Sequence, residues 1–419
     1  MNAETLGDLL ATFCFGYPFV MAYYWMFGAL LYRYMRERYE PVPSAPPALE
    51  EYPPISILVP CFNEEQQAEE TFSALEKIQY PNFEIIAIND GSRDRTGAVL
   101  DELAGRIPNM RVVHLATNQG KSTALNVGAL AARHEWLVGI DGDALLDPHA
   151  LTWCSRRFQN DPLLGGMTGN PRIRNRTTPL GKLQVGEFSA MVGLIKRAET
   201  VYGAIFTVSG ANCAFRKRAL QDAGWWDPAA ITDDVDVSWR VQFSGWNLIY
   251  GPKGICWILT PETISGLWRQ RLRWSEGGTA VVLRAIPYLF RRGGLRMWPL
   301  WLNYVVSIMW SYAMLLMIAI WFLALFGIQT PVVQQGFGFL PQQWGMELAL
   351  TYLLQSLVAA SLDYRVESRM FRNLFWVVWY PLVFWILQAA SAVVGLPYAL
   401  LHLRREKAAT WVSPDRGFR

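Results

Sequence analysis

The sequence predicts an α/β domain of the Rossmann-like class, flanked on both sides by α-helical membrane segments. Short apolar runs alternate with amphipathic stretches over residues 55–262, a pattern typical of strands and helices that follow one another. The chain is 52% hydrophobic and only 17% charged, against about 25% charged in typical domains. The missing charge is concentrated near the two ends, where apolar blocks are long enough for membrane helices.

Four apolar blocks are candidates for membrane helices. They comprise residues 9–31, 298–326, 348–362 and 374–401. A spanning helix needs about 20 apolar residues, which the first, second and fourth blocks supply. The third reaches that length only if residues 344–347 join it, so we expect a tilted or protein-buried segment there. We predict an anchor at 1–33, about three membrane segments in 298–403 and a tail at 404–419.

The basic residues predict how these segments are oriented. Two arginine clusters flank the central region, Arg33, Arg36 and Arg38 before it and Arg291, Arg292 and Arg296 after it. The loop at 327–345 has no Lys or Arg, so the positive-inside rule places the central domain in the cytoplasm. The first eight residues carry two acids and no basic residue, which predicts a retained anchor rather than a signal peptide. Basic residues flank both ends of the last block, which leaves the orientation of the C-terminus open.

Composition argues against several other functions. The five cysteines and four histidines are scattered, without the spacing of a zinc site or a disulfide framework. A net charge of +3 is too small to indicate nucleic-acid binding. No internal repeat indicates a solenoid or a propeller.

The elements of the central domain follow a Pro-rich linker at 34–54. We expect strands at residues 55–61, 83–89, 111–115, 136–140 and 206–208. We expect helices at residues 64–78, 94–107, 121–132 and 148–158. Short apolar strands separated by helices imply a mostly parallel sheet with helices on both faces. Ligands of such sheets bind beyond the carboxyl ends of the strands, where the polar motifs of this chain fall.

Two strand ends carry residues suited to a nucleotide. Asp90 ends the second strand, and we expect its carboxylate to accept hydrogen bonds from a base or a ribose. A turn that caps the next helix is the alternative. Lys121 opens a helix after residues 118–120, where free amides and a lysine suit a phosphate, with a solvated lysine as the alternative. The segment lacks the Walker A pattern, which argues against an ATPase.

The fourth strand ends in a pair of acids, Asp141 and Asp143. Two aspartates one residue apart on a strand point the same way, so both can reach one hard cation that also binds a diphosphate. A simple turn is the common alternative for so short a motif. The motif's place in the same sheet as Asp90 and Lys121 favours the metal site.

Two further motifs lie between this domain and the later membrane segments. Residues 231–236 (ITDDVD) form a carboxylate cluster that can supply a general base. Residues 270–274 (QRLRW) supply an arginine for a diphosphate and a tryptophan for stacking on a sugar ring. Alone, the first would indicate an acidic helix start and the second an amphipathic surface helix. We expect residues 263–297 as a whole to form amphipathic helices on the membrane face.

Together, these motifs resemble the processive family 2 glycosyltransferases, which have the GT-A fold and include cellulose, chitin and hyaluronan synthases. Asp90 and Lys121 match the nucleotide-binding positions of that family. Asp141 and Asp143 match its DxD motif, so the resemblance implies Mg²⁺ or Mn²⁺ on Asp143 with Asp141 beside the donor. The resemblance therefore implies a nucleotide-sugar donor and a divalent cofactor.

The catalytic and acceptor positions of that family match as well. Asp234 corresponds to the last acid of its TED motif, the general base, whereas Asp233 stands where the family usually has Glu. Gln270, Arg273 and Trp274 match the QxxRW motif. By this resemblance Arg273 holds the diphosphate, Trp274 stacks on the acceptor sugar and Gln270 orients the loop. Because the base is retained, we expect activity despite the shorter acid at position 233.

Within the family, the chain is most similar to the bacterial enzymes that make poly-β-1,6-N-acetylglucosamine for biofilm matrix. The runs that carry this likeness are NQGKSTALN, GIDGDALLD, TGNPRIRNR, VGEFSAMVGLIKR, FTVSGANCAFR, GLWRQRLRW and TWVSPDR. The resemblance implies UDP-N-acetylglucosamine, a growing polymer chain and a multi-pass protein of the bacterial inner membrane. It also implies a small two-span membrane subunit and cyclic di-GMP activation, neither of which the sequence itself indicates. Such relatives often have two N-terminal spans, whereas only one is evident here.

An inverting reaction is expected from these parts. Asp234 takes the proton of the acceptor's 6-hydroxyl, and a single displacement converts an α-linked donor into a β-linked product. The same core could instead make a hyaluronan, chitin or cellulose type of polymer, or glycosylate a lipid. A catalytically silent membrane scaffold that senses a nucleotide is the alternative from another class, and the presence of both Asp234 and Trp274 argues against it. The helices from residue 298 onward either form a passage for the polymer or only anchor the catalytic domain.

Overall fold

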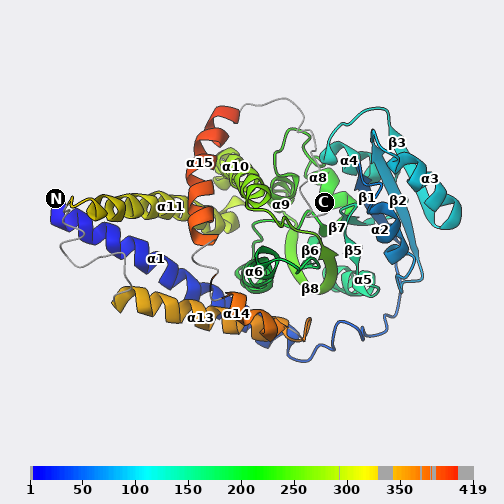
Figure 1. The fold of residues 1–419 in the computed structure, drawn as a ribbon. Coiled ribbons are helices and arrows are strands. Elements are labelled where there is room, and N and C mark those ends of the chain that lie inside the picture. The colour runs from blue at the N-terminus through cyan, green and yellow to red at the C-terminus, as the bar shows by residue number, and fades with distance from the viewer. Residues whose placement is uncertain are drawn as a thin grey trace.

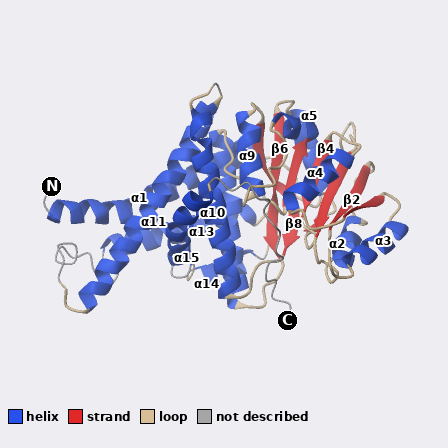
Figure 2. Ribbon diagram, turned by 90° about the horizontal axis from the view of Figure 1, so that it is seen from above, coloured by secondary structure: helices blue, strands red, loops and turns tan. Residues whose placement is uncertain are grey.

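A mixed sheet covered by helices forms one half of the molecule, and long helices form the other half (Figure 1, Figure 2). The computed structural model describes residues 3–291, 293–328, 343–368, 370–377, 379 and 384–403. The predicted tail at 404–419 and most of the loop at 327–345 lie outside the described residues.

The sheet has eight strands within the described residues. They are β1 (Ile55–Cys61), β2 (Phe83–Asp90), β3 (Met110–Leu115), β4 (Trp136–Ile140), β5 (Leu145–Leu146), β6 (Leu164–Ile173), β7 (Asn212–Arg216) and β8 (Asn247–Ile258). Their order is β3-β2-β1-β4-β7-β6-β8-β5. The strands from β3 to β4 are parallel, and β8 is parallel to β6. β7 is antiparallel to β4 and β6, and β5 to β8, so most strand pairs are parallel as predicted but the second half of the sheet is mixed.

Four of the five predicted strands are confirmed, whereas the strand predicted at 206–208 is wrong. The chain reaches the sheet only afterwards, as β7, and the long strands β6 and β8 were not predicted. Glycines within these two strands conceal the alternating pattern, and close packing requires them. A Cβ at Gly169 of β6 would lie 2.1 Å from the side-chain nitrogen of Asn212. A Cβ at Gly251 of β8 would lie 2.4 Å from the sulfur of Met167.

Helices cover both faces of the sheet, as predicted. Phe72, Leu100 and Phe158 bury one face under three helices, and Leu125 and Val237 contribute to the cluster on the other face. The four predicted helices are present with ends that differ by a few residues. The covering helices are α2 (Ala68–Leu75), α3 (Thr96–Arg106) and α5 (Ala150–Asn160) on one face, and α4 (Lys121–Ala131), α8 (Lys217–Asp222) and α9 (Asp233–Phe243) on the other.

Three helical segments among the described residues are long and apolar enough to cross a membrane. They are Thr5–Glu37, Gly294–Leu325 and Trp344–Asp363. The elements within them are α1 (Ala3–Tyr32), η1 (Arg33–Glu37), η3 (Gly294–Met297), α11 (Trp298–Leu325) and α13 (Gln343–Asp363). The third predicted block therefore reaches spanning length by including residues 344–347. These helices extend away from the sheet together (Figure 2).

The crossing predicted for residues 374–401 stays a prediction, because residues 378 and 380–383 lie outside the described part of the chain. After η4 (Met370–Asn373), the described part of that block contains α14 (Leu374–Val377) and α15 (Ile386–His402). α15 packs along α10 (Ile264–Leu289), and Nδ1 of His402 lies 2.8 Å from the Glu276 carboxylate. Residues 263–297, predicted as amphipathic helices on the membrane face, thus consist mainly of the long helix α10, followed by the short η3.

A buried ion network joins the candidate spans to the sheet. Three consecutive helical segments pack against β6 and β8, namely α6 (Pro179–Phe188), η2 (Ser189–Ile195) and α7 (Lys196–Tyr202). Arg197 of α7 donates from Nε to Glu37 at 3.0 Å and from Nη1 to Asp363 at 2.9 Å. Arg172 of β6 donates to the other oxygen of Asp363 at 2.8 Å. Arg197 and Asp363 have no exposed side-chain surface, so this network joins η1, α7, α13 and β6 inside the protein.

Candidate active site

Asp90, at the end of β2, supports the loop before α4. It has no exposed surface, and its two carboxylate oxygens accept hydrogen bonds from the amides of Gln119 at 2.7 Å and Gly120 at 2.9 Å. The next residue, Gly91, has a φ of 64° and approaches the same loop so closely that a Cβ would lie 2.4 Å from its backbone. Asp90 therefore positions this loop. Its expected contact with a base or a ribose stays a prediction.

Lys121, at the start of α4, lies inside a cluster of carboxylates. Its Nζ lies 2.5 Å from Oδ1 of Asp141 and donates to the carbonyl oxygen of Gly210 at 3.1 Å. Burial alone would lower the pKa of Lys121, but the charges of Asp141, Asp233 and Asp234 outweigh burial and hold that pKa above its usual range. Lys121 is therefore a charged, partnered group, and the alternative of a solvated lysine is wrong.

Asp233 and Asp234 form the first turn of α9. Oδ1 of Asp234 accepts a hydrogen bond from the Val235 amide at 2.9 Å. The Ser238 hydroxyl donates to the backbone carbonyl of Asp234 at 2.5 Å and accepts from the amide of Val208 at 2.8 Å. The segment that leads to Gly210 is thereby attached to the start of α9. This attachment brings Asp234 to the same side of the sheet as Lys121.

The surroundings of Asp234 raise the pKa of its carboxyl group above that of an exposed aspartate. Burial raises the pKa of Asp234 to about 6, and the nearby charge of Asp233 adds to the shift. The charges of Lys121 and Arg273 act in the opposite direction. A carboxylate with a pKa close to 6 is deprotonated at neutral pH and still accepts a proton readily, which suits a general base.

The long helix α10 carries the QxxRW residues to the start of α9. Thr263 caps the helix by accepting a hydrogen bond from the Gly266 amide at 3.1 Å. Further along, Gly277 packs against Thr232, where a Cβ would lie 2.4 Å from the threonine hydroxyl. Arg273 lies one turn before Gly277 and is exposed. The close approach at this glycine places the charge of Arg273 near Asp234.

Trp274 is half-buried on α10, beside an ion pair that sequence analysis did not identify. The Arg271 guanidinium lies 4.4 Å from the centre of the Trp274 ring and donates to Glu187 of α6 at 2.7 Å. Both members of this ion pair are buried. Gln270 has a buried side-chain oxygen without a hydrogen-bond partner in the described part of the chain. The acceptor-binding roles of Trp274 and Gln270 stay predictions.

Comparison with known proteins identifies the family. Residues 53–277 match the family described as "Glycosyltransferase like family 2". The chain belongs to glycosyltransferase family 2. This glycosyltransferase is 35% identical to a poly-beta-1,6-N-acetyl-D-glucosamine synthase of Staphylococcus epidermidis, over 96% of its own chain and 97% of that protein. A synthase with the same name from Staphylococcus aureus strain COL is 36% identical over the same shares.

A solved structure confirms the fold of the glycosyltransferase. A mannosyltransferase from Pyrobaculum calidifontis, in complex with GDP-Man and Mn²⁺, superposes with a TM-score of 0.62. The likeness covers 95% of this chain and 99% of that chain at 19% sequence identity. Such a likeness shows the fold alone. The predicted combination of a GT-A domain with apolar helices is confirmed.

The donor atoms of the DxD segment fit a hard divalent cation. Asp141 and Asp143 follow β4, and the intervening Gly142 packs so tightly against β1 that a Cβ would lie 3.2 Å from the Pro60 carbonyl. No group of three or more His, Cys, Asp or Glu side chains among the described residues forms a closed metal site. One or two carboxylates with substrate phosphates and water is the ligand set that Mg²⁺ prefers. The residues present are therefore compatible with a metal held jointly with a diphosphate.

Two groups of residues were missed by sequence reasoning. Gly210 supplies a carbonyl to Lys121, and a Cβ there would lie 3.4 Å from Oδ2 of Asp234. The run that contains it, FTVSGANCAFR, was noted only for its likeness to relatives. Glu187 and Arg271 lie in the runs VGEFSAMVGLIKR and GLWRQRLRW, also noted only for their likeness to relatives, and the 84 positions between them hide the pairing.

We expect Trp274→Ala to reduce polymer yield by several-fold to about tenfold and to leave UDP binding unchanged. An aromatic stacking contact contributes about 0.5–1.5 kcal/mol, and the groups expected to bind the donor lie on other elements. Polymer assays and calorimetry with UDP would measure the two effects separately. Trp268→Ala, on the same helix but outside QxxRW, is the control. Equal losses of UDP binding and polymer yield in Trp274→Ala would contradict an acceptor role.

Proposed function

We propose that this glycosyltransferase polymerises N-acetylglucosamine from UDP-N-acetylglucosamine into β-1,6-linked poly-N-acetylglucosamine for biofilm matrix. The observation that carries the proposal is the 35% identity to a synthase of that name over 96% of the chain, a share that includes the candidate spans as well as the catalytic domain. The protein would work in a bacterial inner membrane, with its catalytic domain in the cytoplasm and polymer export coupled to synthesis. A small two-span subunit and cyclic di-GMP control belong to the proposal by resemblance alone.

In the proposed reaction, Asp234 is the general base. Its carboxylate takes the proton from the acceptor's 6-hydroxyl while that oxygen attacks the anomeric carbon from the face opposite the diphosphate. One displacement inverts the centre and yields a β-linkage. Lys121 and Arg273 provide positive charge for the departing diphosphate, and Trp274 holds the acceptor sugar. The gathering of Lys121, Asp141 and Asp234 around Gly210 supports these roles.

The rate of polymer synthesis is expected to increase with pH through about 6 and to level off above it. Only the deprotonated form of Asp234 can accept a proton, and burial together with the charge of Asp233 raises its pKa above the usual range of an aspartate, to about 6. Removing the charge of Asp233 in Asp233→Asn should therefore move the midpoint to lower pH. Initial rates of both proteins at saturating donor, measured at about 10 pH values between roughly 4.5 and 8, would check the pH dependence and the shift of its midpoint. A midpoint that moves upward in Asp233→Asn would contradict the assignment.

A divalent cation, Mg²⁺ or Mn²⁺, is proposed to bind Asp143 with Asp141 nearby. When bound, it would neutralise charge on the diphosphate leaving group. We expect Asp143→Asn to weaken metal-dependent UDP binding by at least about tenfold, because even outer-shell changes typically cost 10- to 100-fold in metal affinity. Calorimetry with and without a chelator measures this. Asp147→Asn, which changes a nearby acid that accepts a hydrogen bond from the His149 amide, is the control, and unchanged metal-dependent binding in Asp143→Asn would mean that the motif is only a turn.

Linkage analysis of the product tests the proposed function. Membranes containing the purified protein are incubated with UDP-N-acetylglucosamine and either Mg²⁺ or Mn²⁺, and the linkages of any polymer are determined. A β-1,6-linked product supports the proposal. Parallel reactions with added UDP-glucuronate, or with UDP-glucose alone, would reveal a hyaluronan or cellulose type of synthase. A β-1,4-linked polymer or a glycosylated lipid would replace the proposed product, and UDP binding without any transfer would indicate the nucleotide-sensing scaffold.

A further inference from the structure

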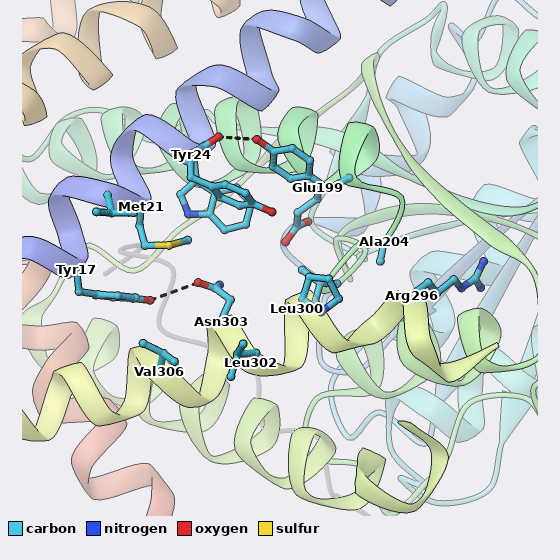
Figure 3. A pocket seen from close by; sticks show the side chains of 14 residues that line it. Tyr17, Met21, Tyr24, Glu199, Ala204, Arg296, Leu300, Leu302, Asn303 and Val306 are labelled. Carbon is cyan, nitrogen blue, oxygen red and sulfur yellow. Dashed lines mark hydrogen bonds between the residues drawn. The ribbon is translucent and has the colours of Figure 1, made fainter. Parts of the chain in front are cut away.

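A cavity of about 360 Å³ lies between α1, α7 and α11, away from the catalytic motifs (Figure 3). Its volume falls within the range of about 300–1,000 Å³ that is common for small-molecule sites. Most of its surface is apolar, and none of the predicted site residues lines it. Residues that define its walls include Tyr17, Met21, Glu199, Leu302, Asn303 and Val306.

The cavity is polar at one end and apolar along its length. Glu199 and the stem of Arg296 lie at the end nearest the sheet domain. Val306 lies at the other end. It follows Arg296 by ten positions, which corresponds to about 15 Å at the helical rise of 1.5 Å per residue. Val20 and Leu302 are 62% and 53% exposed, and both lie on helices that are candidate membrane spans. The cavity therefore opens toward the surroundings of the spans.

Among the described residues that line the cavity, Glu199 is the one with an acidic side chain. It is 5% exposed, and its Oε2 is buried without a hydrogen-bond partner in the described part of the chain. Burial raises the pKa of Glu199 to about 7, against the lowering effects of Lys196 and the Phe206 amide. A buried acceptor without a donor is costly, so a donor located in the cavity would stabilise this arrangement.

We propose that the cavity binds one bilayer lipid whose headgroup carries a hydrogen-bond-donating ammonium. The acyl chain would lie between α1 and α11, and the ammonium would donate to Oε2 of Glu199. The Glu199 carboxylate, at the end of the cavity nearest the sheet, matches the ammonium headgroup, and the apolar walls formed by α1 and α11 match the acyl chain. A partner helix is about 10–12 Å across with its side chains, which is too wide for a cavity of this volume.

The helix α7, which forms one wall of this cavity, also supports residues 206–210, which lead into the active site. Glu199 accepts a hydrogen bond from the Phe206 amide, and the Lys196 ammonium donates to the Thr207 carbonyl. The same segment continues to Gly210, whose carbonyl contacts Lys121. The proposed lipid would thus contact the helix that holds the segment leading into the active site.

Competition between two lipids tests the proposal. The full-length protein, stripped of lipid in detergent, is exposed to equal amounts of phosphatidylethanolamine and phosphatidylcholine with identical chains, and retained lipid is counted by native mass spectrometry. Methylation removes every N–H donor from phosphatidylcholine and leaves the net charge unchanged. We expect the wild-type protein to retain one phosphatidylethanolamine with a preference of about tenfold, the effect of one hydrogen bond to a charged group. Equal retention of the two lipids, or no retained lipid, overturns the proposal.

Three variants locate the binding to this cavity. Glu199→Gln should bring the ratio of the two lipids close to one while total retention persists. Leu302→Trp, which fills the cavity, should abolish retention of both lipids. Met309→Trp introduces the same side chain at a 58% exposed position of α11 outside the cavity and should leave retention unchanged. If Leu302→Trp and Met309→Trp retain the same amount, the lipid binds elsewhere and the proposal is wrong. The readout requires no polymer synthesis, so it is independent of the proposed function.

Discussion

Asp234→Asn should reduce polymer synthesis by roughly 10²- to 10⁴-fold, the contribution that a positioned general base typically makes. Asparagine keeps the size of the side chain and can still accept the hydrogen bond from the Val235 amide, but it cannot take a proton. Folding and UDP binding should therefore persist. Initial rates with UDP-N-acetylglucosamine, measured beside calorimetry with UDP, would separate loss of the base from loss of the site.

Two other acids of the same turn provide controls for this result. Asp236→Asn changes a neighbouring acid whose carboxylate lies 2.6 Å from Arg240 and points to a different partner, so its rate should fall by only several-fold. Asp233→Glu introduces the acid that relatives usually have and should leave the rate within several-fold, because Asp234 is untouched. Near-normal synthesis by Asp234→Asn together with severe loss in Asp236→Asn would show that Asp234 is not the general base.

Arg197→Met should destabilise the folded protein by about 3–5 kcal/mol, the usual cost of removing one partner from a buried ion pair. The methionine leaves the Glu37 carboxylate buried without either guanidinium contact and removes one of the two arginines that neutralise Asp363. Unfolding by denaturant in detergent micelles, monitored by tryptophan fluorescence, would measure the change. Because the network joins α13 and η1, the continuation of α1, to the sheet, we also expect α1 and α13 to become more accessible to proteases.

An exposed ion pair offers a matched comparison for Arg197→Met. Arg106 lies 2.9 Å from Glu69, the same distance that separates Arg197 from Asp363, but both side chains of the exposed pair are about half accessible. Arg106→Met should therefore have little measurable effect, since water already screens this pair. Similar destabilisation by the two substitutions would show that the buried network does not hold the spans to the catalytic domain.

Much of the site could be predicted from the sequence, because its motifs directly follow locally recognisable elements. Asp90 and Asp141 come at the ends of apolar strands, and Asp234 opens a helix. Their roles were harder to predict than their positions. The contact of Asp90 with a nucleotide stays a prediction, and the structure adds that its carboxylate holds two backbone amides of a loop 29 and 30 residues away. A short motif cannot reveal which distant donors a carboxylate will meet.

The second half of the sheet was not accessible to sequence reasoning for a similar reason. β6 and β8 contain glycines that break the alternating pattern, and these glycines are explained only by contacts with strands distant in the sequence, such as Gly169 with Asn212 and Gly251 with Met167. The fourth apolar block was long enough for a span, but its last helix packs along α10 beside Ser275 and Glu276. Apolar composition alone does not distinguish a helix that faces lipid from one that faces protein.

Sequence by itself determined the class of this protein: an α/β domain with strand-end carboxylates, a QxxRW helix and apolar helices of spanning length. Each of these features depends on neighbouring residues, whose periodicity and length follow from helix and strand geometry. The tertiary structure decided the mixed strand order, the pairing of Lys121 with Asp141 and the buried contacts of Arg197 with Glu37 and Asp363. These contacts join residues up to 166 positions apart. They form because buried charges require partners, and only the packed fold determines which partners lie within reach.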